Sequence, residues 1–432
     1  MPYFQDLADL MGELGPWADL RHEQGAPVKP VIKRLRKELL RAKEDLLAMR
    51  PKKKMRDLEP NKLIAIRRLR PDGPRWIWRR FQKRGLQNRL RGAWLGRAAG
   101  CTLGAAVEGW DVAAMESLAA LHRMAFPPED YWAGHPQPES LRYEREPVSA
   151  YLQGRIKAVP MDDDLVYTLL GLLILEAYGP TFTTEAVAEV WLKYLPTACT
   201  AEKIALENLR AGIPPKMAAG VNNPYQEWIG ADIRCDPWGY AAPGLPEKAA
   251  EMAYRDARLT HRQNGIYGAM FFAAALSAAF TLDCPLKALD IGLTEIPADC
   301  RLARDLRWAR DLAPQLQDWR AARAAVDQRF AGMHPVHTNN NACLTVFGLH
   351  LGQKDFTRTI GTTVAMGLDN DCTAATAASI LGAVIGAKHI PEHWWKPFRN
   401  RTRTYLIGHE QFSNTDIVKR FYAQAQRLWE TL

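Results

Sequence analysis

The sequence predicts an all-α fold, and three observations support this class. Many segments of helical length are apolar at helical spacing, whereas we find no convincing alternating strand of five or more residues. No fixed-period repeat is present. The 432 residues are 47% hydrophobic and 24% charged, which is typical of a globular protein and excludes a fibrous or generally disordered chain. The predicted helices cover residues 31–49, 165–178, 184–194, 246–259, 267–281, 300–316, 319–330, 341–351, 355–366, 372–387 and 414–432.

The N-terminal part of the chain is strongly basic. Residues 1–91 hold 24 Lys and Arg against 11 Asp and Glu, whereas the whole chain has a net charge of only +9, so the remainder is slightly acidic. Prolines interrupt the basic part, and from about Leu86 the sequence becomes small and apolar. The sequence therefore predicts a basic helical extension over residues 1–85 and a main domain over residues 86–432.

Aromatic residues are interleaved with the basic ones near the end of this extension, at Trp76, Trp78 and Phe81. Such a stretch could bind nucleic acid, with cations along the phosphates and rings stacked on bases. The alternative is that the rings pack on the main domain. We favour packing, because basic runs are common on solvated helices and define no geometry by themselves.

Two regions of the main domain, residues 111–160 and 222–246, are rich in Pro and aromatic residues and have little periodicity. We expect long, structured loops there, because loops of this length in a compact domain are usually functional and the aromatic content argues against disorder. Asp236, Trp238 and Tyr240 in the second region are candidates for shaping a substrate pocket.

The sequence predicts a cytoplasmic protein with no membrane segment. The first residues lack the basic stretch and apolar run of a signal peptide. The longest small and apolar stretches, residues 266–280 and 374–387, are too short to cross a bilayer. Seven cysteines scattered along a long chain favour a reducing compartment over a disulfide framework.

Two acidic clusters each precede an apolar helix. Asp162, Asp163 and Asp164 come before the helix at 165, and Asp369 and Asp371 come before the helix at 372. Helix capping could explain either cluster alone, but two such clusters favour a hard divalent cation such as Mg²⁺, which takes oxygen ligands. Residues two apart on a helix diverge, so Asp369 and Asp371 are expected to converge only in a turn before their helix.

Other candidate residues are fewer. Glu108 follows a glycine-rich segment and could act as a general base beside a metal-bound water, or be an ordinary surface residue. His337 and Asn339 could line a pocket or cap the helix that follows, and the sequence leaves both options open. No nucleophile elbow, phosphate-binding loop or paired Cys-x-x-Cys motif is present.

Taken in order, these motifs resemble the ADP-ribosylglycohydrolase family, and the Pro- and Trp-rich loop at 222–246 resembles a bacterial branch of it. The resemblance runs from about residue 86 to 400. The matching segments are Gly92 to Glu108, Met161-Asp-Asp-Asp164, Thr260-His261, Asp369-Asn-Asp-Cys372 and Ile390-Pro391 with Trp394.

The resemblance implies an orthogonal all-α bundle with a binuclear Mg²⁺ centre that promotes attack of water on the anomeric carbon of ribose. Two positions depart from the family motifs, because Met161 and Cys372 stand where threonines are usual, which leaves one or two ions open. The implied metal ligands are Asp162, Asp163, Asp369 and Asp371. The implied catalytic residues are Glu108, Asp163 and Asp371. Candidate substrate-binding residues are Asp164, Trp238, Tyr240, His337, Asn339 and Asn370.

The leading functional hypothesis is a metal-dependent hydrolase that cleaves a glycosidic bond to ribose, most simply one that removes ADP-ribose from a modified acceptor. A second enzyme hypothesis is an N-glycosidase that acts on a nucleoside-like small molecule, since an altered ligand set could accompany a changed substrate. A third, non-enzymatic hypothesis is a protein that only binds ADP-ribose, or nucleic acid through the basic extension.

Overall fold

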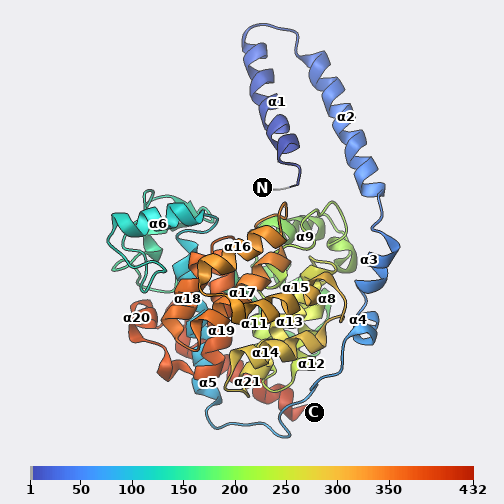
Figure 1. Ribbon diagram of the computed structural model, residues 1–432. Helices are drawn as coiled ribbons and strands as arrows, with labels where there is room; N and C mark the ends of the chain where they lie inside the picture. The colour runs from blue at the N-terminus through green and yellow to red at the C-terminus, as the bar shows by residue number, and fades with distance from the viewer. Residues whose placement is uncertain (1–2) are drawn as a thin grey trace.

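The computed structural model describes residues 3–432 and shows an all-α bundle, which confirms the predicted class (Figure 1). The strands found in these residues form two short antiparallel pairs. β1 (Leu141–Arg142) pairs with β2 (Glu146–Pro147), and β3 (Arg401–Arg403) pairs with β4 (Gln411–Ser413). Within the described residues, no helix combines the length and the apolar character that crossing a membrane requires.

The centre of the bundle is made of helices that are buried on almost every side, as their small and apolar residues predict. These are α5 (Leu86–Ala105), α7 (Asp163–Tyr178), α13 (Asn264–Ala279), α17 (Thr338–Gly352) and α19 (Asn370–Ile385).

Amphipathic helices surround this centre. The predicted helices lie within a few residues of their observed bounds, whereas α6, α9, α10, α14 and α20 were not predicted. The surrounding helices are α6 (Val112–Leu121), α8 (Thr184–Tyr194), α9 (Thr200–Arg210), α10 (Pro215–Ala218), α12 (Pro246–Ala257), α14 (Pro285–Gly292), α15 (Arg301–Leu312), α16 (Trp319–Arg329), α18 (Phe356–Ala365), α20 (Glu392–Trp395) and α21 (Asn414–Glu430).

Helices α5 and α19 approach each other at backbone distance. α5 carries a glycine at every fourth position, so the four glycines lie on one face of the helix. A Cβ atom added to any of them would come closer than 3.0 Å to backbone atoms of α19. Only glycine fits this interface, and the contact fixes the register of the two helices. The four residues are Gly92, Gly96, Gly100 and Gly104.

The N-terminal region consists of a helical hairpin and a strap. The hairpin, α1 (Gln5–Glu23) and α2 (Lys29–Ala48), buries none of its residues and stands away from the body (Figure 1). α1 was not predicted, because two glycines and Pro16 weaken its helical pattern. The strap contains α3 (Lys53–Leu58) and α4 (Leu63–Leu69) and runs along the body. The division of the chain at residue 85 stays a prediction.

Ion pairs and aromatic contacts attach the strap to the body. Arg70 pairs with the buried Glu295 at 2.5 Å. The rings of Trp76 and Trp78 lie 5.6 and 6.2 Å from that of Trp429 in α21. These rings therefore pack on the body, as we favoured, while the cations of α2 remain exposed. Nucleic-acid binding by the basic extension stays a prediction.

Residues 222–246 differ from the expected loop. They contain η2 (Ile229–Ala231) and the short helix α11 (Asp236–Ala241), whose residues are all buried. Pro237 occupies the first turn of α11, where a missing N–H costs nothing. Proline thus starts a helix here, although in the sequence it suggested a loop.

We predict that Gly100→Ala destabilises the fold by about 3 kcal/mol, because the added methyl group overlaps the backbone of Ala374. Urea unfolding followed by circular dichroism measures the change. The matched control is Gly12→Ala, where nothing lies within 4 Å and alanine favours the helix. Equal stability of the two variants would contradict the close contact.

Candidate active site

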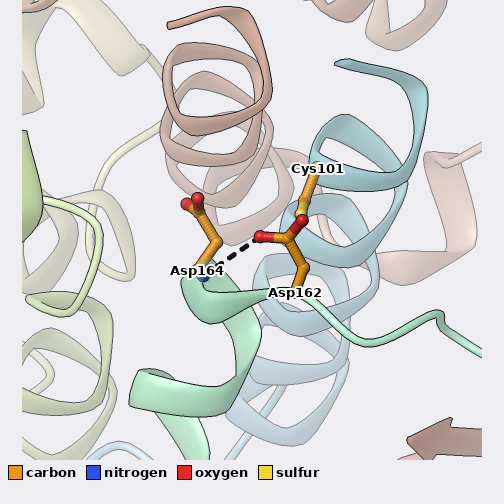
Figure 2. A group of neighbouring side chains, drawn as sticks. All are labelled: Cys101, Asp162 and Asp164. Atoms are coloured by element: carbon orange, nitrogen blue, oxygen red, sulfur yellow. Dashed lines mark hydrogen bonds between the residues drawn. The ribbon is translucent and has the colours of Figure 1, made fainter. Parts of the chain in front are cut away.

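The two acidic clusters and the turn that follows α5 meet at one place. Asp162 caps α7 and accepts a hydrogen bond from the backbone N–H of Asp164 at 3.1 Å (Figure 2). Asp369 precedes α19, and carboxylate oxygens of Glu108, Asp369 and Asp371 lie within 4.8 Å of one another. Asp371 lies in the first turn of α19 and not before the helix, which corrects our expectation. The carboxylates of Asp369 and Asp371 converge nevertheless, because Asp369 lies before the helix and its side chain does not follow the helical spacing.

Side-chain amides hold the start of α19 in place. The Nδ2 of Asn370 donates to the backbone oxygens of Val107 at 3.4 Å and Val364 at 3.3 Å. The Oδ1 of Asn341 accepts from the backbone N–H of Asp369 at 3.2 Å. Asn370 therefore ties the turn that carries Glu108 to the mouth of α19, and it is fully buried.

An arginine that sequence reasoning missed lies inside the carboxylate cluster. The Nη1 of Arg142 is 2.7 Å from Glu108, and its Nη2 is 2.9 Å from Asp162 and 3.1 Å from Asp371. Arg142 belongs to β1, in the region expected to be a loop. No local pattern distinguishes it from neighbouring arginines, because its position depends on how the β1–β2 hairpin folds.

A second missed arginine neutralises the far side of the cluster. Arg97 in the middle of α5 is completely buried and pairs with Asp164 and Asp236, each at 2.9 Å. It also donates to Thr168 at 3.0 Å. A single arginine in a small, apolar helix is a signal that could have revealed this ion-pair network, because buried arginines are almost always paired.

Burial makes ionisation of the cluster costly. Desolvation first, and then neighbouring carboxylates, raise the pKa of Asp163 and Asp371 well above their usual range. The same causes raise the pKa of Asp369 to about 6. The hydroxyl of Tyr143 donates to Asp163 at 2.7 Å and partly offsets its burial. Such a group of carboxylates has a strong affinity for positive charge.

One set of donors fits a hard divalent cation. The carboxylates of Glu108, Asp369 and Asp371 offer only oxygen atoms, and the buried Oδ1 of Asp369 has no hydrogen-bond partner. Two other groups of possible ligands each include a buried thiol, Cys101 or Cys372, together with Asp164.

The two thiol-containing groups do not fit such an ion. Burial raises the pKa of both thiols, so they stay protonated, and sulfur is a poor ligand for Mg²⁺. Asp164 already pairs with Arg97 and accepts from the thiol of Cys372 at 3.1 Å. Figure 2 shows Cys101, Asp162 and Asp164 gathered where α7 begins beside α5.

The remaining predicted residues lie apart from the cluster. His337 caps α17 through the backbone N–H of Asn339 at 3.1 Å, and the Nδ2 of Asn339 donates to Asp305 at 2.7 Å. Trp238 and Tyr240 are buried in the core, where the Tyr240 hydroxyl contacts Ser379 at 2.9 Å. Both side chains are buried because α11 packs inward, and their part in substrate binding stays a prediction.

The fold and the site together define an all-α protein with a cluster of carboxylates at the N-termini of two buried helices. This class includes glycosidic-bond hydrolases. The chain belongs to the ADP-ribosylglycohydrolase family, whose model matches residues 82–428. Membership indicates a hydrolase of the glycosidase type, in a family that is generally metal-dependent.

A comparison of structures agrees with this fold. A solved structure titled "ADP-ribosylglycohydrolase-related protein complex" superposes with a TM-score of 0.52 at 19% sequence identity, covering 79% of this chain and 98% of that chain. At this identity the similarity shows the fold alone. No curated protein sequence is similar enough to count as a match.

We predict that Arg97→Met lowers the free energy of unfolding by about 3–5 kcal/mol, because it leaves Asp164 and Asp236 buried without their cation. Chemical denaturation measures the loss. The control Lys396→Met removes an exposed pair with Glu392 and is expected to change stability by less than about 1 kcal/mol. If the two variants behaved alike, the buried arginine would not be needed for charge compensation.

Proposed function

We propose that the chain hydrolyses a glycosidic bond to ribose, and that its most direct activity is the release of ADP-ribose from a modified acceptor. Two findings support the proposal: membership of the ADP-ribosylglycohydrolase family, and the meeting of Glu108, Asp369 and Asp371 at one place. The second finding carries the proposal, because Glu108 comes from a part of the chain distant from Asp369 and Asp371, and capping alone would not require them to meet.

The exposed fractions of the carboxylate side chains suggest which of them meets substrate and water and which of them lie below. The side chain of Glu108 is 41% exposed, whereas that of Asp371 is 2% exposed. Glu108 therefore stands at the opening, where substrate and water arrive, and Asp369 and Asp371 form the floor. A magnesium-class ion held by these three residues would bind ribose hydroxyls and acidify a water molecule.

The protein's own groups then act on the proton and on the developing charge. Glu108 accepts a proton from the attacking water, since a carboxylate at the solvent edge exchanges that proton readily. The negative charges of Asp162 and Asp371 oppose the positive charge that grows on the ribose ring as the bond to the leaving group breaks. Asp163, which Tyr143 orients, remains a candidate catalytic residue at the edge of the cluster.

The other hypotheses differ in substrate or in the absence of turnover. An N-glycosidase would release a base from a nucleoside-like molecule at the same carboxylates. A pure binder would hold ADP-ribose without cleaving anything. A panel of arginine-, serine- and nucleic-acid-linked ADP-ribose together with simple nucleosides, assayed with Mg²⁺, distinguishes the three.

We predict that Glu108→Gln and Asp371→Asn each lower the release of ADP-ribose about 100-fold or more, because each removes a charge that the reaction uses. Liquid chromatography of the released sugar nucleotide measures the rate. Glu116→Gln on α6 is the matched control, since that carboxylate pairs with Arg320 at the surface, and it is expected to keep wild-type activity.

Release of a free base from nucleosides, with no cleavage of any ADP-ribosylated acceptor, would favour the N-glycosidase. Tight binding of ADP-ribose without turnover of any member of the panel would favour the binder. Either result would refute the proposed activity.

A further inference from the structure

The guanidinium of Arg142 joins the two acidic motifs directly. Its Nη2 contacts Asp162 at 2.9 Å, before α7, and Asp371 at 3.1 Å, in α19. Its Nη1 contacts Glu108 at 2.7 Å and the backbone oxygen of Ala105 at 2.8 Å. One side chain thus connects all three segments that build the site, and each of the three carboxylates accepts a hydrogen bond from it.

The surrounding structure holds Arg142 in this position. Its side chain is only 13% exposed. The hairpin that carries it turns through Tyr143 and Glu144, both with positive φ, and pairs Arg142 with Glu146. The rings of Tyr143 and Tyr151 lie 5.3 and 5.5 Å from the guanidinium, within the range of cation–π contacts. These contacts indicate that the guanidinium of Arg142 is held in a fixed position within the cluster.

An ion and this guanidinium cannot share Asp162 and Asp371. A Mg²⁺ ion that bridged these carboxylates would sit about 2.0–2.1 Å from their oxygens. That place overlaps the Nη2 of Arg142, which already contacts both. Arginine stays protonated in proteins, so the guanidinium cannot make room for an ion by losing its own charge.

The sequence agrees with this exclusion. Met161 and Cys372 stand where the family motifs carry threonine, and neither sulfur is a suitable ligand for a hard cation. The thiol of Cys372 points instead to Asp164, which Arg97 already neutralises. Arg142 thus fills the space of a second ion, and Met161 and Cys372 leave such an ion fewer oxygen donors. Arg142 contacts only one oxygen each of Glu108 and Asp371, so Glu108, Asp369 and Asp371 keep an all-oxygen set for one ion.

We propose that Arg142 permanently takes the place of one of the two cations that the family resemblance implies, so that the chain works with a single divalent ion. Arg142 supplies positive charge between the acidic motifs, and the bound ion is confined to the side of Asp369. The inference rests on the proposed function, because it concerns the same site.

Counting bound ions tests the inference without measuring turnover. The full chain, stripped with a chelator, is titrated with Mn²⁺, and the loss of the free-ion signal in electron paramagnetic resonance gives the number bound per chain. Wild type is expected to bind one ion. Arg142→Ala is expected to bind two, because it frees Asp162 and Asp371. The control Arg145→Ala changes an exposed arginine of the same hairpin and is expected to bind one.

A wild-type count of two or of none would overturn the inference. It would also be overturned if a folded Arg142→Ala bound no more ions than wild type. Circular dichroism checks folding, and Arg142→Gln, which keeps polar contacts but removes the charge, replaces the alanine variant if that fails to fold. A wild-type count of two or of none overturns the inference even if neither variant folds.

The two proposals fail in different ways. If the ion counts are as expected but no ADP-ribosylated substrate is cleaved, the proposed function fails and the single-ion site stands. If wild type releases ADP-ribose and binds two ions, the role of Arg142 fails and the proposed function stands.

Discussion

The close contact between α5 and α19 determines where the chemistry of this protein is located. Because glycines replace side chains along α5, its backbone rests directly on that of α19, and Gly104 lies against the backbone of Asp371. The turn after α5 then places Glu108 beside the N-terminus of α19. Any wider spacing would separate Glu108 from the carboxylates at the start of α19, which are far from it in the sequence.

Buried charge is the second constraint, and two arginines satisfy it in different ways. Arg97 lies beneath the cluster with no exposure and holds Asp164 against Asp236, so it belongs to the framework of the core. Arg142 reaches the cluster from a surface hairpin and touches the exposed Glu108 together with the buried Asp162. Within residues 3–432, the carboxylate of Asp369 has no arginine partner, and its buried Oδ1 accepts no hydrogen bond.

The sequence was sufficient for the fold class, most helices and the meeting of the acidic motifs, because apolar periodicity and adjacent carboxylates are local features. It was insufficient where position depends on tertiary packing. Arg142 reaches the site because the chain turns at Tyr143 and Glu144, which both have positive φ, and no spacing rule in the sequence predicts this turn. Trp238 and Tyr240 lie in a Pro- and Gly-rich stretch that the sequence predicts as a loop, yet α11 turns both into the core. His337 proved to cap a helix.

The attachment of the strap to α21 has a consequence for how the protein is made. The rings of Trp76, Trp78 and Phe81 meet Trp429 or Tyr422, on a helix that leaves the ribosome after the other elements of the body. Since chains emerge from the N-terminal side first, the contacts of these rings with α21 cannot form until α21 has been synthesised. Packing of these rings on α21 is therefore a late folding event, and it joins early and late parts of the polypeptide.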